Sequence, residues 1–224
     1  MTVLFVIATI ILFLMLDWFT RKVRSKQILS VRSPVLSTTN GSYPVRVPEG
    51  IFFAPSHTWL TLFPSGKIRL GVDDFISRLL DKPEIVMLKH AGDHVRQGDP
   101  LMHMKQANHS LTIRSPIDGE ILAVNEELAQ NPLLLRERLF SDGWSYMLKP
   151  KNLSRMKNML IGSETRMWIQ EEFRRLRDLL AGVGRDGAIQ PACLQDGGPP
   201  FSGALATMDD AFWKKLDTEF LTVE

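Results

Sequence analysis

The chain has 224 residues, of which 44% are hydrophobic and 23% are charged, and its formal net charge at pH 7 is +2. This composition is typical of a globular domain with extensions, and without a basic stripe interleaved with aromatic residues it argues against a nucleic-acid partner. The single cysteine, Cys193, excludes an internal disulfide, a CxxC redox pair and a cysteine-rich metal site.

The chain begins with an uncharged apolar run over residues 3–16, and four basic residues, Arg21, Lys22, Arg24 and Lys26, follow it. A helix over residues 1–19 would span about 28 Å, close to the thickness of a bilayer core. A cleaved signal peptide is disfavoured because its basic residues would precede the apolar run. We therefore predict a transmembrane anchor at residues 1–20 that contacts membrane lipid through residues 3–19. Since basic residues favour the inner side, we expect a single-pass protein of the cell membrane, with its N-terminus outside and its soluble domain cytoplasmic.

Residues 21–50 are predicted to be a basic juxtamembrane segment and a linker, because they carry Ser, Thr, Asn, Gly and Pro with little periodicity. Short β-type runs separated by turn residues follow over residues 51–162. The runs at residues 57–63 and 67–72 predict a hairpin, and Asp73 is expected to cap a short helix. Further strands are predicted at residues 85–89, 101–105, 111–114 and 120–124. Strands at this spacing predict a small barrel or sandwich.

Residues 163–224 are predicted to form a helical C-terminal extension with a connector rich in Gly and Pro. The first helix is expected over residues 164–180, with Ser163 as its N-cap and Gly182 as its stop. The second is expected over residues 209–221, with Thr207 as a candidate cap. Both carry apolar stripes that must pack against the domain or a partner: Ile169, Phe173, Leu176 and Leu180 on the first, and Phe212, Leu216 and Phe220 on the second.

An ordered series of short motifs resembles the glycine cleavage H-protein family. The series contains His-Thr-Trp at residues 57–59, Leu-Gly-Val-Asp-Asp-Phe at 70–75, Glu-Ile-Val-Met-Leu at 84–88, Ser-Pro-Ile-Asp-Gly-Glu at 115–120, Asn-Pro at 131–132 and Asp-Gly-Trp at 142–144. The resemblance implies a mainly β fold, a lipoyl-domain-like flattened β-barrel or barrel-sandwich hybrid with short helices. It also implies a carrier whose lipoyl group sits on a lysine at the tip of a β-hairpin.

The resemblance departs from the family at that lysine. In the family register, counted back from Ser115, Asn108 stands at the lipoyl-lysine position and Lys105 lies three residues earlier. A carboxamide cannot form the lipoyl amide, although Asn suits a tight turn. We therefore predict a non-catalytic, membrane-tethered binding or assembly subunit with no lipoyl arm, no cofactor and no active site. The hairpin residues Lys105, Gln106, Asn108 and His109 form its predicted interaction surface.

The alternative is a working lipoyl carrier of glycine cleavage or a related pathway, with lipoate on Lys105. Strand faces alternate, so a displacement of three residues would place this lysine on the other face from the tip residue. No metal site is expected, because a turn interrupts His90 and His94, and His103 with His109 across the hairpin would supply only two ligands. The anchor favours a protein partner at the membrane, with a membrane-associated redox complex as a candidate, because tethering raises effective concentration.

Overall fold

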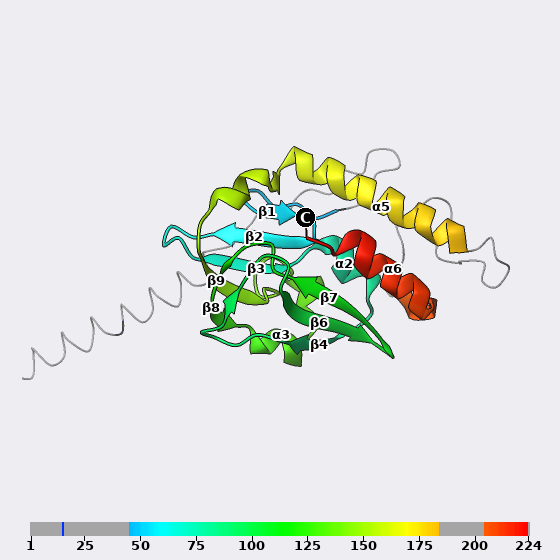
Figure 1. Cartoon of the computed structure of the whole chain (residues 1–224), viewed down its shortest axis with the longest axis horizontal. Coiled ribbons are helices and arrows are strands. Elements are labelled where there is room, and N and C mark those ends of the chain that lie inside the picture. Colours follow the sequence, from blue (N-terminus) through cyan, green and yellow to red (C-terminus); the bar gives the residue numbers. More distant parts are fainter. Residues whose placement is uncertain (1–14, 16–44, 184–203, 224) are drawn as a thin grey trace, which may run out of the picture. The chain divides into compact units, whose positions relative to one another are not determined.

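The computed structural model describes Met15, residues 45–183 and residues 204–223. Apart from Met15, the predicted anchor at residues 1–20 lies outside these residues, as do most of the predicted linker and the centre of the Gly/Pro-rich connector. No helix in the described part of the chain combines the length and the apolar character needed to cross a bilayer. The described residues form two antiparallel sheets with short helices and two C-terminal helices (Figure 1). The predictions of a mainly β fold and of two C-terminal helices are therefore confirmed.

The larger sheet is seven-stranded and contains the predicted first hairpin. Its strands are β1 (Phe52–Ala54), β2 (Thr58–Leu62), β3 (Ile68–Val72), β5 (His94–Val95), β8 (Gly119–Val124), β9 (Tyr146–Pro150) and β10 (Leu160–Ile161). They lie in the order β10-β1-β2-β3-β9-β8-β5. In the β2–β3 hairpin Leu60 pairs with Leu70 and Leu62 pairs with Ile68. Leu60, Leu70 and Ile68 are fully buried, whereas Leu62 at the end of β2 is exposed. Trp59 on the opposite face of β2 is fully buried as well, so the start of this strand is covered on both faces.

The smaller sheet is three-stranded and contains β4 (Glu84–Met87), β6 (Pro100–Gln106) and β7 (His109–Arg114), in the order β4-β6-β7. Leu101, Met102 and Met104 of β6 are fully buried. The two sheets are joined by Tyr146 of β9, whose hydroxyl donates to the carbonyl oxygen of Leu101 at 2.6 Å. This buried hydrogen bond fixes the base of the β6–β7 hairpin against the larger sheet.

The helices are α2 (Asp74–Leu79), α3 (Glu126–Gln130), α4 (Leu134–Glu137), the 3-10 helix η1 (Ser154–Asn158), α5 (Ser163–Val183), the 3-10 helix η3 (Ala204–Thr207) and α6 (Asp210–Phe220). The predicted cap of α2 is confirmed, because the Asp73 carboxylate accepts hydrogen bonds from the backbone N–H groups of Phe75 and Ile76 at 3.0 and 3.1 Å. A carboxylate here also interacts favourably with the positive end of the helix.

Three predicted helix boundaries are wrong. Helix α5 begins at Ser163, which is therefore its first residue and not its N-cap. Helix α5 continues through Gly182 to Val183, because a glycine inside a helix costs only about 1 kcal/mol and does not by itself end it. Helix α6 is capped by Asp209, whose carboxylate accepts from the N–H of Phe212 at 2.9 Å, while Thr207 ends η3. The stripes of both helices are buried as predicted.

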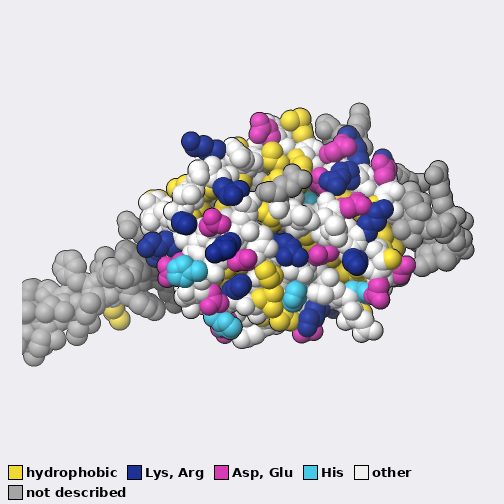
Figure 2. Space-filling model, viewed as in Figure 1, with side chains coloured by type: hydrophobic (Ala, Val, Ile, Leu, Met, Phe, Trp, Pro, Cys, Tyr) yellow, Lys and Arg dark blue, Asp and Glu magenta, His cyan; other side chains and the backbone are white. Residues whose placement is uncertain are grey.

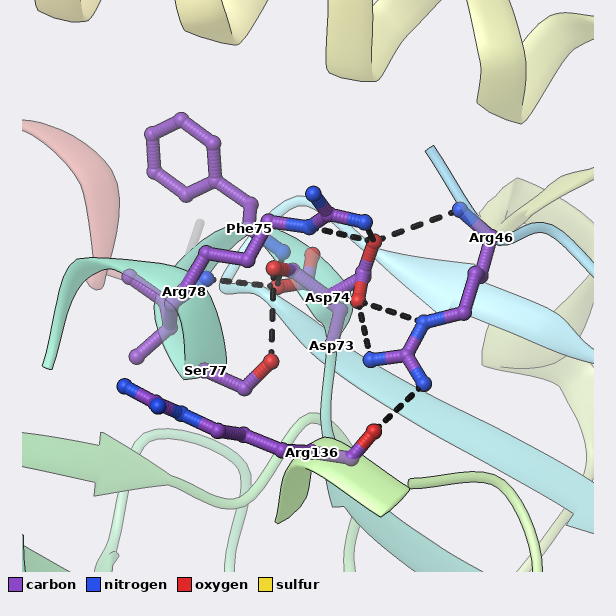
Figure 3. Close-up of polar contacts among 8 residues, drawn as sticks. Arg46, Asp73, Asp74, Phe75, Ser77, Arg78 and Arg136 are labelled. Carbon is purple, nitrogen blue, oxygen red and sulfur yellow. Dashed lines mark hydrogen bonds and ion pairs between the residues drawn. The ribbon is translucent and has the colours of Figure 1, made fainter. Parts of the chain in front are cut away.

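The chain enters the domain through a buried ion cluster (Figure 3). The Asp74 side chain is 1% exposed and accepts from the guanidinium groups of Arg46, at 2.5 and 2.8 Å, and of Arg78, at 2.8 Å. Arg46 also donates to the carbonyl oxygen of Arg136 at 2.7 Å. Two cations around one buried carboxylate offset its desolvation, and they attach residues 45–47 to the domain.

Gly119 is a position where any side chain would meet backbone. A Cβ atom on Gly119 would lie 2.7 Å from the carbonyl oxygen of Lys149 on the neighbouring strand. We expect Gly119→Ala to lower the free energy of unfolding by about 1–3 kcal/mol, as overpacking does in a close-packed interior, in chemical denaturation of the purified chain. The control Ala123→Ser on the same strand should change it by less than about 0.5 kcal/mol. Equal stability of Gly119→Ala and the unchanged protein would contradict the close approach.

Candidate functional site

The apex of the β6–β7 hairpin is a two-residue turn formed by Ala107 and Asn108. Gln106 pairs with His109 and Lys105 pairs with Ser110, so the strands continue up to the turn. Asn108 is exposed at the tip. The positive φ of the turn lies on Ala107, at 54°. This conformation costs a residue with a Cβ about 1–2 kcal/mol.

Lys105 lies within the strand and not at the apex. It is half-buried, and in the register of the three-stranded sheet it has Glu84 of β4 on one side and Ser110 of β7 on the other. The neighbouring Gln106 is also engaged, since its side-chain oxygen accepts from the N–H of Asp81 at 2.8 Å. The hairpin therefore presents a carboxamide at its tip, with the amine of Lys105 further down on the sheet.

Helix α6 covers the outer edge of this hairpin, which the sequence did not predict. His109 lies 2.8 Å from the Asp210 carboxylate, and its ring stacks on Trp213 with centroids 5.1 Å apart. Further along, the N–H of Thr112 donates to the Asp217 carboxylate at 2.8 Å. Because β7 is the edge strand of its sheet, this bond satisfies an outward N–H that would otherwise face water or another chain. An open cleft of about 270 Å³ remains between the hairpin tip and α6.

A second polar group, centred on His57, joins the two C-terminal helices to the β domain. The His57 side chain is fully buried in a positive-φ turn, at 58°, between the rings of Phe75 and Trp168, with centroids at 4.3 and 4.8 Å. Its Nδ1 atom lies 2.7 Å from the Asp73 carboxylate and its Nε2 atom lies 3.8 Å from the Glu172 carboxylate of α5. Burial alone would lower the pKa of His57, but these two carboxylates raise it to about 9.

Arg175 extends this group from α5 to α6. Its guanidinium contacts the Glu172 carboxylate at 2.8 Å and lies over the ring of Phe220 at 4.7 Å from the centroid. Desolvation alone would raise the pKa of Glu172, but the nearby His57 ring and the contact with Arg175 lower it. The network therefore contains two carboxylates and two cations, shared by α2, α5 and the β1–β2 turn, with α6 packed over it.

The histidine pair proposed from the sequence does not form across the hairpin. His103 pairs with Thr112 in the strand register, and its Nδ1 lies 3.3 Å from the Thr112 hydroxyl, whereas His109 pairs with Gln106 and turns to α6. The prediction that His103 and His109 face each other is wrong because they are not opposite in the register. Among residues 45–183 and 204–223, no three His, Cys, Asp or Glu side chains come together in a way that could hold a metal ion.

Residues 51–172 match the family model of the glycine cleavage H-protein. The chain belongs to this family. It is 30% identical to the glycine cleavage system H protein of Shewanella loihica over 126 residues, which is 56% of this chain and 98% of that protein. It is 32% identical to the corresponding protein of Hydrogenovibrio crunogenus over 51% of this chain and 88% of that one. The crystal structure of a Mycobacterium marinum H protein aligns with a TM-score of 0.47 at 21% identity, over 53% of this chain and 94% of that chain.

The family assignment confirms the resemblance seen in the sequence, and H-proteins are carriers rather than enzymes. The matched range ends at Glu172, inside α5. Asp73, the nearer carboxylate to His57, lies within the match, Glu172 is its last residue, and Arg175 and all of α6 lie beyond it. The cover on the β6–β7 hairpin comes from the part of this chain outside the H-protein match.

The raised pKa of His57 makes the stability of the domain depend on pH. The folded protein holds the His57 proton up to a pKa of about 9, against 6.5 for an unperturbed histidine, so its contribution is complete below about pH 6.5 and is lost as the pH rises to about 9. The difference between these two pKa values corresponds to a contribution of about 3 kcal/mol to the free energy of unfolding. We expect the unfolding free energy of the detergent-solubilised full chain, from urea titrations, to fall over this pH range.

The exposed histidine His90 supplies the control for this measurement. His57→Gln should be less stable than the unchanged protein at pH 6, and its free energy of unfolding should change little between about pH 6.5 and 9. His90→Gln should be as stable as the unchanged protein at pH 6 and should show the same fall in unfolding free energy over this pH range. If the unchanged protein and His57→Gln show the same dependence on pH, His57 is not the protonated group.

Proposed function

We propose that this protein is a non-catalytic binding or assembly subunit, tethered to the membrane, which keeps the H-protein scaffold without a lipoyl arm. The observation that carries the proposal is the hairpin tip, where Asn108 offers a carboxamide. Attachment of lipoate forms an amide and requires an amine nucleophile, which a carboxamide nitrogen does not provide. The residues at the tip therefore do not fit the prosthetic group.

The position of Lys105 supports the same proposal. A carrier lysine must reach a ligase and then swing its arm between partners, which requires a tip position. Lys105 instead lies in the central strand of the three-stranded sheet, next to Glu84 and Ser110 on its two neighbours. The alternative function is a working carrier with lipoate on Lys105, which a mass measurement can distinguish.

Helix α6 limits which part of the hairpin can bind a partner. The outer edge of β7 is occupied by Trp213 and Asp217 and is therefore closed to a partner. The hairpin surface left open to a partner is the tip, where Asn108 is exposed and Lys105 and Gln106 are half-buried below it. We propose that this surface binds a protein partner, with a membrane-associated redox complex as a candidate.

The tether is part of the proposal and is supported by the sequence. The apolar run at residues 3–16 followed by four basic residues favours a single-pass anchor in the cell membrane, with the N-terminus outside and the H-protein domain in the cytoplasm. Such an anchor would hold the domain near a membrane partner and raise its effective concentration there. A carrier that shuttles between soluble enzymes gains nothing from this restriction.

Intact-mass measurement after co-expression with a lipoate ligase tests the loss of the arm. We expect no lipoyl mass increment on the unchanged protein or on Asn108→Gln, because neither has an amine at the tip. Asn108→Lys restores an amine there and should acquire the increment, and an ordinary H-protein in the same cells is the positive control. An increment on the unchanged protein that disappears in Lys105→Ala would establish the carrier alternative and overturn the proposal.

Cell fractionation tests the tether. We expect the full chain to stay in the membrane fraction after high-salt and carbonate washes, and its domain to be digested by protease in inside-out vesicles but not in spheroplasts. The double variant Ile10→Asp and Leu12→Asp should move to the soluble fraction, since a charge at the centre of a spanning helix costs about 2.5–3.5 kcal/mol. The matched variant Ile10→Val and Leu12→Val should stay. Recovery of the unchanged chain in the soluble fraction would refute the anchor.

A further inference from the structure

The segment that leads from β9 into α5 carries an exposed surface of mixed basic and apolar character. Its exposed basic residues are Lys151, Arg155, Lys157 and Arg166, and its exposed apolar residues are Leu153, Ile161 and Met167. We name these seven residues the basic face. In Figure 2, Lys and Arg side chains project on the side where the chain passes from β9 to α5, with hydrophobic side chains between them.

The apolar part of the basic face is unusual for this protein. The side chains of Leu153 and Ile161 are each 41% exposed and that of Met167 is 67% exposed. They are three of the five exposed large hydrophobic residues within residues 45–183 and 204–223. Single exposed apolar residues are ordinary, but a group of them within one short segment indicates a contact surface.

The cations of the basic face are not neutralised by the domain. The ion pairs among the described residues use other cations, such as Arg136, Arg138 and Arg174, and none involves Lys151, Arg155, Lys157 or Arg166. Between residues 149 and 167 the only carboxylate is Glu164. Residues 151–167 therefore carry four cations and one carboxylate, in a chain whose total charge is only +2.

A cleft of about 120 Å³ opens on the basic face beside Arg155. Neutral polar residues Ser56, Gln97 and Asn158 also line it, and its remaining walls are apolar, including Pro116 and Met159. Arg155 is the only charged residue among those that line it. A guanidinium with neutral polar groups around it suits a phosphate group, because guanidinium–phosphate hydrogen bonds are strong and directional.

We propose that the basic face docks on an anionic lipid surface, with a headgroup phosphate in the cleft beside Arg155. Cations attract the negative leaflet, and apolar side chains between them enter the boundary of headgroups and acyl chains. An acidic protein would use the same cations, but exposed aliphatic side chains between them favour lipid. The docking builds on the proposed membrane attachment, but it is argued from residues of the folded domain and not from the anchor. The docking and the anchor can therefore be disproved independently.

A probe on the basic face of the full chain tests the docking. We would attach an environment-sensitive fluorophore to Leu153→Cys in a Cys193→Ser background and reconstitute the chain in nanodiscs. The discs would contain phosphatidylcholine alone or phosphatidylcholine mixed with phosphatidylglycerol. We expect blue-shifted, brighter emission in the anionic discs only, and reversal of the shift at high salt because the interaction is screened. Retention of the protein in neutral discs reports the anchor, whereas dependence of emission on lipid charge reports the basic face.

Two triple variants with the same change in net charge make the test specific. Lys151→Gln, Arg155→Gln and Lys157→Gln together should lower the ratio of docked to undocked protein on the order of 100-fold. The control combines Lys82→Gln, Arg174→Gln and Lys215→Gln, which are all exposed and outside the basic face, and it should keep the shift. If the chain does not enter discs, flotation with vesicles of the same two compositions measures the docking instead. The proposal is overturned if the emission shift is the same with neutral and anionic lipid. It is also overturned if the two triple variants reduce the shift equally.

Discussion

The charge on His57 ties the C-terminal helices to the β domain. An imidazolium without any exposure is costly in a protein interior, and it persists only where carboxylates compensate for the lost hydration. Here one carboxylate, Asp73, comes from the cap of α2 and the other, Glu172, comes from α5. Removal of either partner would leave buried charge uncompensated. The H-protein domain and its extension are therefore coupled through one proton, besides the apolar contacts that surround it.

The coupling continues from α5 to the hairpin. Arg175 links Glu172 to the ring of Phe220 at the end of α6. The other end of α6 reaches the hairpin tip, where Asp210 meets His109. One helix thus contacts both the buried cluster and the hairpin tip.

The sequence predicted the parts of the fold that depend on local patterns. Alternation identified β2 and β3, and Asp73 was recognised as a cap because its helix begins immediately after it. The cover of α6 on β7 could not be found in this way, because Thr112 and Asp217 are 105 residues apart and no local pattern relates them. The apolar stripe of α6 showed that the helix needs a partner surface but not which surface. His57 was noticed only as part of a motif, because its burial depends on Phe75 and Trp168 from distant segments.

The tight turn at the hairpin tip is held by its surroundings. Ala107 takes a positive φ, which is unfavourable for a residue with a Cβ atom. Such a cost persists only where other contacts stabilise the same geometry. Those contacts are present: the strand register up to Gln106 and His109, the stacking of His109 on Trp213, and the bond from Thr112 to Asp217 all require the two strands to remain paired to the tip. Packing against α6 therefore gives this hairpin a structural reason to keep its shape that does not depend on presenting a swinging arm.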